Sequence, residues 1–139
     1  MSSATTPRTR SAEAGVREVL DGVARAWAGG DADAVADACA KNARMVLSDD
    51  RFLRGREMIR TAMTREFATA DRGRTLVQDV VDLRFLQPGV AVVVTEGGDL
   101  VAEERRPVRA TWVLANGLDG WRIAAYQNSR IAGETPPGA

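Results

Sequence analysis

The chain has 139 residues, 45% of them hydrophobic and 27% charged, a composition that suits one globular domain and excludes a disordered or fibrous protein. Its 19 basic and 19 acidic residues balance, which removes any global electrostatic attraction to nucleic acid or to an anionic membrane surface. The absence of histidine and the presence of a single cysteine exclude Ser-His-Asp and Cys-His nucleophilic chemistry, histidine-ligated zinc and an intrachain disulfide.

Both ends of the chain are polar or proline-rich and predict tails. Residues 1–10 lack the apolar stretch of a secretory signal, and residues 133–139 contain the adjacent prolines Pro136 and Pro137. We therefore expect one domain over residues 11–132, between a disordered N-terminal tail and a flexible C-terminal tail. No apolar run approaches the ~20 residues that a membrane-spanning helix needs, so we expect a soluble, cytoplasmic protein.

Three helices are predicted in the first half of the domain. Apolar residues spaced three and four apart mark the buried face of each one, and Gly29-Gly30 separates the first from the second. Cys39 shares the stripe of Val35 and is expected to be an inert buried thiol. A short strand over residues 43–48 should precede the third helix. The expected helices cover residues 11–28, 31 to about 41, and 55–70.

After Gly73 the apolar period changes from helical to two, which predicts strands. A turn at Gln87-Pro88-Gly89, a break at Gly97-Gly98 and a five-residue loop over 116–120 should divide them. Helices followed by an antiparallel meander indicate an α+β fold. The expected strands cover residues 75–86, 90–96, 106–115 and 121–130.

Four short motifs occur in order along the chain: Gly30-Asp31, Gly55-Arg56-Glu57, residues 79–85 and residues 120–128. With the order of the elements, they resemble the nuclear transport factor 2-like superfamily, also called SnoaL-like. Within it they look most like the SgcJ/EcaC group, which is similar to proteins of enediyne and other polyketide antibiotic pathways. The resemblance implies three N-terminal helices packed on a strongly curved antiparallel sheet, a cone-shaped, cystatin-like roll that encloses a pocket.

The isomerase chemistry of this superfamily does not transfer to these residues. The ketosteroid isomerase branch uses an Asp base with a Tyr and a protonated Asp as oxyanion hole. Alignment through Gly55-Arg56-Glu57 places Leu47 or Ser48 at the base position and Val23 at the Tyr position. The second carboxyl position falls near residues 110–111, which are Ala and Thr.

Three further activities find little or no support. The SnoaL cyclase branch needs a histidine, and the chain has none. Asp82 and Arg84 match part of the Asp, Arg and Asp set of the limonene epoxide hydrolase branch, in reversed order, and their spacing is also common in surface ion pairs. The SgcJ/EcaC group is often called oxidoreductase, yet no Gly-x-Gly-x-x-Gly turn joins a strand to a helix here.

Asp79 is the candidate catalytic residue. Unbroken alternation along residues 75–86 carries its carboxylate to the same face as Val77 and Val81, toward the expected cavity. A carboxylate there needs a partner, local water or a raised pKa, and the last is the state of a general acid or base. A bulge or strand end that lets Asp79 reach water, or a stabilising pair with a buried Arg, is the alternative.

Ligand-binding candidates are the large side chains expected around the pocket. The tryptophans among them are also typical of a core. The last strand offers either Gln127, with Trp121 and Ile123, or the opposite face with Tyr126 and Asn128, and we choose the Gln127 face. The ligand-binding candidates are Trp27, Met63, Phe67, Trp112 and Gln127.

Two classes of function stay open. The first is a binding protein for an apolar intermediate of enediyne or polyketide biosynthesis, and the alternative is a cyclase, isomerase or hydratase that uses a buried carboxylate. We expect no metal and no cofactor. Expected partners are an apolar small molecule, other biosynthetic proteins and a second copy of the chain, while nucleic acid and membranes are not expected. The homodimer would form through an apolar outer sheet face that contains residues 90–94 and the set Leu76, Gln78, Val80, Asp82, Arg84 and Leu86.

Overall fold

The structure, a computed structural model of the chain, describes residues 6–69, 75–101, 104–105 and 108–131. These residues form three helices and seven strands in an α+β order, as predicted. The helices are α1 (Pro7–Ala28), α2 (Ala32–Asp37) and α3 (Arg56–Thr69). The strands are β1 (Cys39–Val46), β2 (Phe52–Arg54), β3 (Thr75–Gln87), β4 (Val90–Val101), β5 (Glu104–Arg105), β6 (Val108–Gly117) and β7 (Gly120–Arg130).

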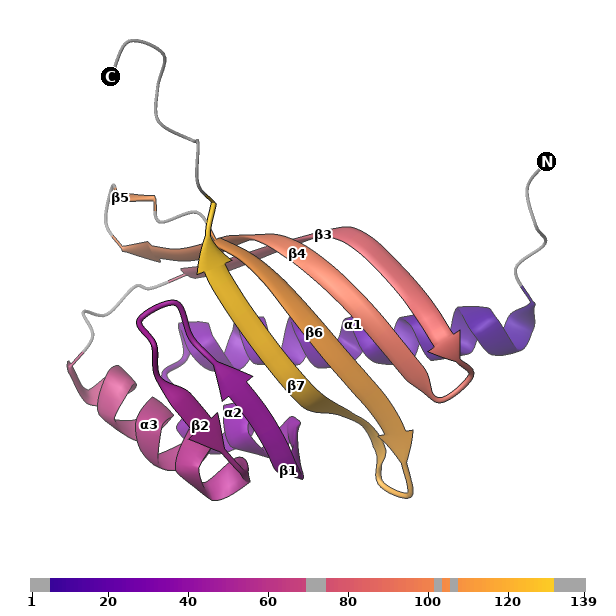
Figure 1. Cartoon of the computed structure of the whole chain (residues 1–139), viewed down its shortest axis with the longest axis horizontal. Helices are drawn as coiled ribbons and strands as arrows, with labels where there is room; N and C mark the ends of the chain where they lie inside the picture. Colours follow the sequence, from indigo (N-terminus) through magenta and orange to yellow (C-terminus); the bar gives the residue numbers. More distant parts are fainter. Residues whose placement is uncertain (1–5, 70–74, 102–103, 106–107, 132–139) are drawn as a thin grey trace, which may run out of the picture.

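The strands build one strongly curved sheet in the order β2-β1-β7-β6-β4-β3, with β5 paired to β4. All neighbours are antiparallel except β1 and β7, which are parallel because the chain crosses the sheet between them. Figure 1 shows α1 running across one face of the sheet, while α2 and α3 cover the end formed by β1 and β2. Side chains from both the sheet and the helices therefore face the space between them.

The first helix begins earlier than the sequence predicted. The Thr6 hydroxyl accepts a hydrogen bond from the backbone N–H of Thr9 at 3.1 Å, and Pro7 occupies the first helical turn. The expected tail over residues 1–10 is therefore too long, since Pro7 to Arg10 are helical. Residues 1–5 and the predicted tail over 133–139 lie outside the described residues.

The second helix is shorter than predicted, and a strand replaces its end. It ends at Asp37 and not near Lys41, because Cys39 already pairs with Ile123 of β7. The strand β1 then forms a hairpin with β2, an element that the sequence analysis missed. The turn between them contains Asp49.

The strands differ from the prediction at two pairs of glycines. The ladder between β3 and β4 continues through Gly97 and Gly98 instead of ending there. Gly97 has φ 149°, and a Cβ atom on it would lie 2.2 Å from the carbonyl oxygen of Val77, so only glycine fits this close approach. Between β6 and β7, Gly117 pairs with Gly120, which shortens the expected five-residue loop to a two-residue turn.

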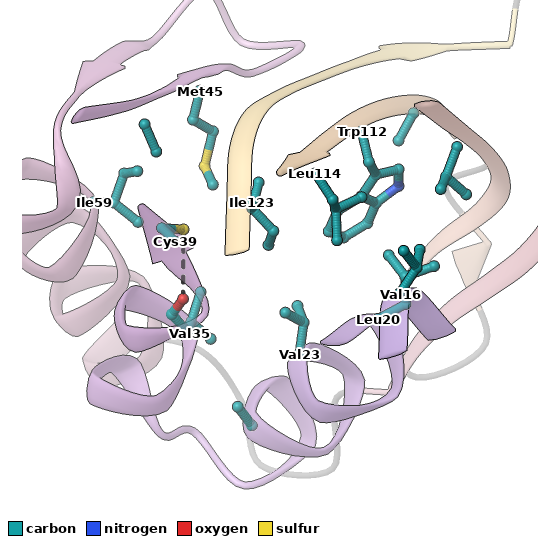
Figure 2. Close-up of a cluster of buried hydrophobic side chains, with 14 of the residues drawn as sticks. Val16, Leu20, Val23, Val35, Cys39, Met45, Ile59, Trp112, Leu114 and Ile123 are labelled. Atoms are coloured by element: carbon teal, nitrogen blue, oxygen red, sulfur yellow. Dashed lines mark hydrogen bonds between the residues drawn. The ribbon is translucent and has the colours of Figure 1, made fainter. Parts of the chain in front are cut away.

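The core lies between α1 and the concave face of the sheet. Figure 2 shows Val16, Leu20 and Val23 of α1 facing Trp112 and Leu114 of β6, and all five side chains are buried. The helical spacing of the first three residues therefore predicted the buried face of α1 correctly. In the described part of the chain, none of the helices has the length and hydrophobicity to cross a bilayer.

Candidate functional site

A cavity of about 290 Å³ lies between the concave face of the sheet and the helices. We call it the central cavity. Its volume is at the lower end of the range of known ligand pockets, about 300–1,000 Å³. Its interior is mainly apolar, with contributions from all three helices and from four strands: Val23, Trp27, Val35, Cys39, Met45, Met63, Leu76, Trp112, Ile123 and Tyr126.

Three of the five predicted ligand-binding residues line the central cavity. They are Trp27 at the end of α1, Met63 of α3 and Trp112 of β6. Phe67 does not line it, because its ring packs behind Trp27 in an edge-to-face contact with centroids 5.0 Å apart. The indole Nε1 of Trp27 is buried and has no hydrogen-bond partner among the described residues.

Asp79 lies on the wrong face of β3 for the role predicted from the sequence. Val80 pairs with Thr95 and Asp82 pairs with Val94, so Val81 is an extra residue that forms a bulge. Before the bulge the inward residues are therefore Leu76, Gln78 and Val80 and not their neighbours.

The carboxylate of Asp79 is consequently exposed on the outer face of the sheet, opposite Glu96 in the ladder. Glu96 forms an ion pair there with Arg109, with Nη2 and Oε2 2.6 Å apart. Asp79 does not line the central cavity, and Gln78 lines it instead. The parity of the strand was thus predicted wrongly at this point.

On β7, a bulge likewise places Gln127 on the opposite face from the one predicted. Val113 pairs with Ala125 and Leu114 pairs with Ile123, which leaves Ala124 as an extra residue. The bulge keeps Ile123 inside but turns Gln127 outward, where it is exposed. The cavity-lining residues beyond the bulge are Tyr126 and Asn128, the pair on the face that the sequence analysis set aside.

Tyr126 and Asn128 contribute polar groups to the cavity wall, in addition to Gln78. The Asn128 amide accepts a hydrogen bond from the backbone N–H of Ser48 at 2.8 Å and donates one to the Tyr126 hydroxyl at 2.9 Å. The Tyr126 ring also packs edge-on against Trp112, with centroids 4.5 Å apart. Burial raises the pKa of Tyr126, and the bond from Asn128 opposes this only in part, so the phenol is protonated at neutral pH.

Arg51, Asp49 and Glu66 lie at the rim of the cavity and form ion pairs with one another. Arg51 donates to both carboxylate oxygens of Asp49, at 3.1 and 2.9 Å, and to Glu66 at 3.2 Å. The hydrogen bonds from Arg51 lower the pKa of Asp49, although burial opposes them slightly. Asp49 is therefore ionised at neutral pH and a weak base. Arg130, at the exposed end of β7, is the second cation of the rim.

Cys39 lies in the cavity wall as an unreactive thiol. It is 0% exposed and donates a hydrogen bond to the Val35 carbonyl oxygen at 3.5 Å (Figure 2). Burial raises its pKa to about 11, against a smaller opposing effect of the Arg56 guanidinium. A neutral thiol is a poor nucleophile. No group of three Cys, Asp or Glu side chains suited to a metal ion occurs in the ranges that the structure describes.

The model of the SnoaL-like domain family matches residues 16–133 of the chain. No curated protein sequence matches this chain significantly. Solved structures share the fold at low identity. A Nostoc punctiforme domain of unknown function with a cystatin-like fold is 22% identical, has a TM-score of 0.79, and the match covers 87% of this chain and 78% of that one.

Two further structures carry names that suggest activities. A proposed aromatic ring hydroxylase from Novosphingobium aromaticivorans is 19% identical, with a TM-score of 0.74 and coverage of 88% of this chain and 90% of that one. A proposed dehydratase of the NTF2-like family from Streptomyces avermitilis is 18% identical, with a TM-score of 0.73 and coverage of 91% and 99%. At these identities the similarity shows the cystatin-like fold, and the activities belong to those proteins.

Proposed function

The chain belongs to the SnoaL-like domain family, and on that basis we propose that it binds a small apolar molecule in the central cavity. The observation that carries the proposal is the cavity itself, about 290 Å³ of space walled mainly by apolar and aromatic side chains. Concave, mostly apolar sites with a few polar groups are typical of small-molecule binding. Burial of a ligand's apolar surface there would supply most of the binding free energy.

Binding is a better match to this cavity than acid–base catalysis. The acid–base enzyme considered from the sequence needed the carboxylate of Asp79, which lies on the outer face of the sheet. The carboxylates that do line the cavity belong to Asp49 and Glu66, both at the rim and both paired with Arg51. Neither is a free buried base that could take a proton from a ligand in the interior.

For the origin of the ligand we propose an apolar intermediate of enediyne or polyketide biosynthesis. This finer assignment is supported by the four motifs that resemble the SgcJ/EcaC group, which include Gly55-Arg56-Glu57 and residues 120–128. The small cavity favours a compact, ring-containing intermediate over a large macrocycle. Such a role would place the protein beside enzymes that form or modify polyketide carbon skeletons.

Filling the cavity should weaken ligand binding. We expect Leu76→Trp, which adds an aromatic ring at the cavity wall, to weaken the binding of the bicyclic hydrocarbon tetralin by at least about tenfold. The matched control is Leu86→Trp, the same change on the same strand at a side chain that is 60% exposed. Calorimetric titration and the rise in melting temperature with added tetralin measure both variants. Equal binding by the two variants would contradict the proposed site.

We also propose that a second copy of the chain covers the outer face of the sheet. Val81 and Leu86 are 52% and 60% exposed there, and the bulge at Val81 adds Val77 to the outward side of β3. Val92 and Val94 of β4 and Val113 of β6 continue the face across the sheet. An apolar surface of this width is typical of an interface.

Light scattering at micromolar concentration should give twice the chain mass of 14.9 kDa. The variant Val81→Arg should shift the mass toward the monomer, because it places a charge in the interface. Leu118→Arg, at a fully exposed side chain in the turn between β6 and β7, should leave the dimer intact. A monomer mass for the unmodified chain would overturn this assignment.

A further inference from the structure

The hydrogen bonds around Asn128 determine which way its amide points. Its partner at 2.8 Å is the backbone N–H of Ser48, a group that can only donate. The atom of Asn128 that faces Ser48 must therefore be the oxygen Oδ1. This leaves the amide nitrogen Nδ2 facing the hydroxyl of Tyr126 at 2.9 Å.

The orientation of Asn128 in turn assigns the role of the Tyr126 hydroxyl. An amide –NH2 group can only donate, so the Tyr126 oxygen accepts this bond and its own proton is not used in it. In the part of the chain that the structure describes, Tyr126 donates no hydrogen bond, and the side chain lines the central cavity. The natural acceptor for its proton is whatever occupies that cavity.

The surroundings of Tyr126 favour an uncharged acceptor. Trp112 packs against its ring and Met45 lies beside it in the ladder between β1 and β7. Both are apolar, so a buried carboxylate beside Tyr126 would lose its hydration without gaining a cation. Arg51 at the rim is already paired with two carboxylates. Arg130 is exposed at the rim and could hold an anion only in contact with water.

We propose that the central cavity selects an uncharged ligand with a carbonyl-type oxygen that accepts a hydrogen bond from Tyr126. Asn128 is the positioning residue that directs the Tyr126 proton toward the ligand, and the Ser48 backbone N–H holds Asn128 in place. The inference rests on the proposed function, because it names the class of ligand for the same cavity. Ketones and quinones of one or a few rings have the required chemistry.

The test compares bicyclic probes of similar size that differ in one polar group: tetralin, 1-tetralone, 1-tetralol and 1-naphthoate. We expect 1-tetralone to bind the unmodified protein about 3- to 10-fold more tightly than tetralin, the gain from one hydrogen bond. Tyr126→Phe should abolish this advantage while the affinity for tetralin stays within about twofold. The carbonyl stretching frequency of bound 1-tetralone should be lowered in the unmodified protein and should return upward in Tyr126→Phe.

Asn128→Asp tests the positioning role with the phenol still in place. The new carboxylate accepts hydrogen bonds from both Ser48 and Tyr126, so the phenol proton turns toward it and only lone pairs face the cavity. We expect the variant to bind 1-tetralol more tightly than 1-tetralone, because only the alcohol can donate a hydrogen bond to these lone pairs. A loss of structure alone would weaken all probes together and leave their ratios unchanged.

The outcomes separate the inference from the proposed function. If the unmodified protein binds tetralin and 1-tetralone equally, or prefers 1-naphthoate, the cavity binds apolar molecules but the carbonyl assignment is wrong. An unchanged ratio of 1-tetralone to tetralin affinity in Tyr126→Phe would also overturn it. If tetralin and the other probes all fail to bind, the proposed function itself is contradicted and the inference fails with it.

Discussion

Trp112→Ala is expected to lower the free energy of unfolding by about 3–5 kcal/mol, the usual cost of removing a buried large aromatic side chain. Trp112 is 4% exposed and contacts the Tyr126 ring. The residue borders the central cavity, so the structure cannot close over the space that the indole leaves. The loss is a large fraction of the roughly 5–15 kcal/mol that stabilises a domain. Urea denaturation followed by circular dichroism measures it.

The expected cost has two contributions, the lost packing of the indole ring and the lost hydrogen bond from Trp112 to Thr95. The Trp112 Nε1–H donates to the Thr95 hydroxyl at 2.9 Å, and Thr95 is itself 3% exposed. Trp112→Phe keeps an aromatic ring but leaves that hydroxyl without its donor, which should cost about 1–3 kcal/mol. Adding Thr95→Val to Trp112→Phe should recover part of this loss, because the unpaired hydroxyl is gone.

Leu118→Ala, a substitution at a solvent-exposed residue, serves as the control. It should alter the free energy of unfolding by less than about 0.5 kcal/mol. A Trp112→Ala cost below about 1 kcal/mol would contradict the buried position of the indole.

The identity of the main elements followed from the spacing of their apolar residues, together with the glycine and turn signals between them. In α1, apolar residues at the spacing of one helical face, Val16, Leu20 and Val23, are all buried, and period two identified the strands after Gly73. These patterns are visible because each element must bury one continuous face. The three-residue strand β2 and the early start of β1 have no such pattern, since tertiary pairing determines them. β2 pairs with β1, and Cys39 at the start of β1 pairs with β7.

The face of a strand was predictable only up to its bulge. Each relevant bulge adds one residue within a pair of identical residues, Val80-Val81 on β3 and Ala124-Ala125 on β7. Nothing in such a pair shows that one member is extra, yet one extra residue exchanges the inner and outer faces beyond it. The errors at Asp79 and Gln127 both have this origin.

One physical signal in the sequence favoured the correct arrangement of β3. Unbroken alternation places the ionised carboxylate of Asp79 inside, at a cost of several kcal/mol unless it is paired. A bulge places both Asp79 and Asp82 outside, where both are in fact exposed. The hydrogen bonds among Ser48, Tyr126 and Asn128 had no comparable signal, because Ser48 and Asn128 are 80 residues apart in the chain.

Raising the pH from 9 to 11 is expected to remove about 2 kcal/mol of stability through Cys39. The thiol has a pKa near 9.0 when solvent-exposed and about 11 in the folded protein, chiefly because of burial. Below pH 9 it is neutral in both states and contributes its full stability. Between pH 9 and 11 the unfolded chain ionises while the folded protein does not, which favours unfolding by about 1.4 kcal/mol per pKa unit.

Urea denaturation at pH 7.5, 9, 10 and 11 measures this slope, and Cys39→Ala is the matched variant. The substitution removes the titrating group, so the variant should lose about 2 kcal/mol less than the unmodified chain over that range, whatever its stability at pH 7.5. Tyr126, whose pKa is also raised by burial, should contribute a loss of the same sign to both proteins. Because that contribution is common to both, the difference between their slopes isolates the thiol. Parallel slopes would show that Cys39 ionises as easily in the folded protein as in the unfolded chain, and hence that the wall of the central cavity is open to water at this residue.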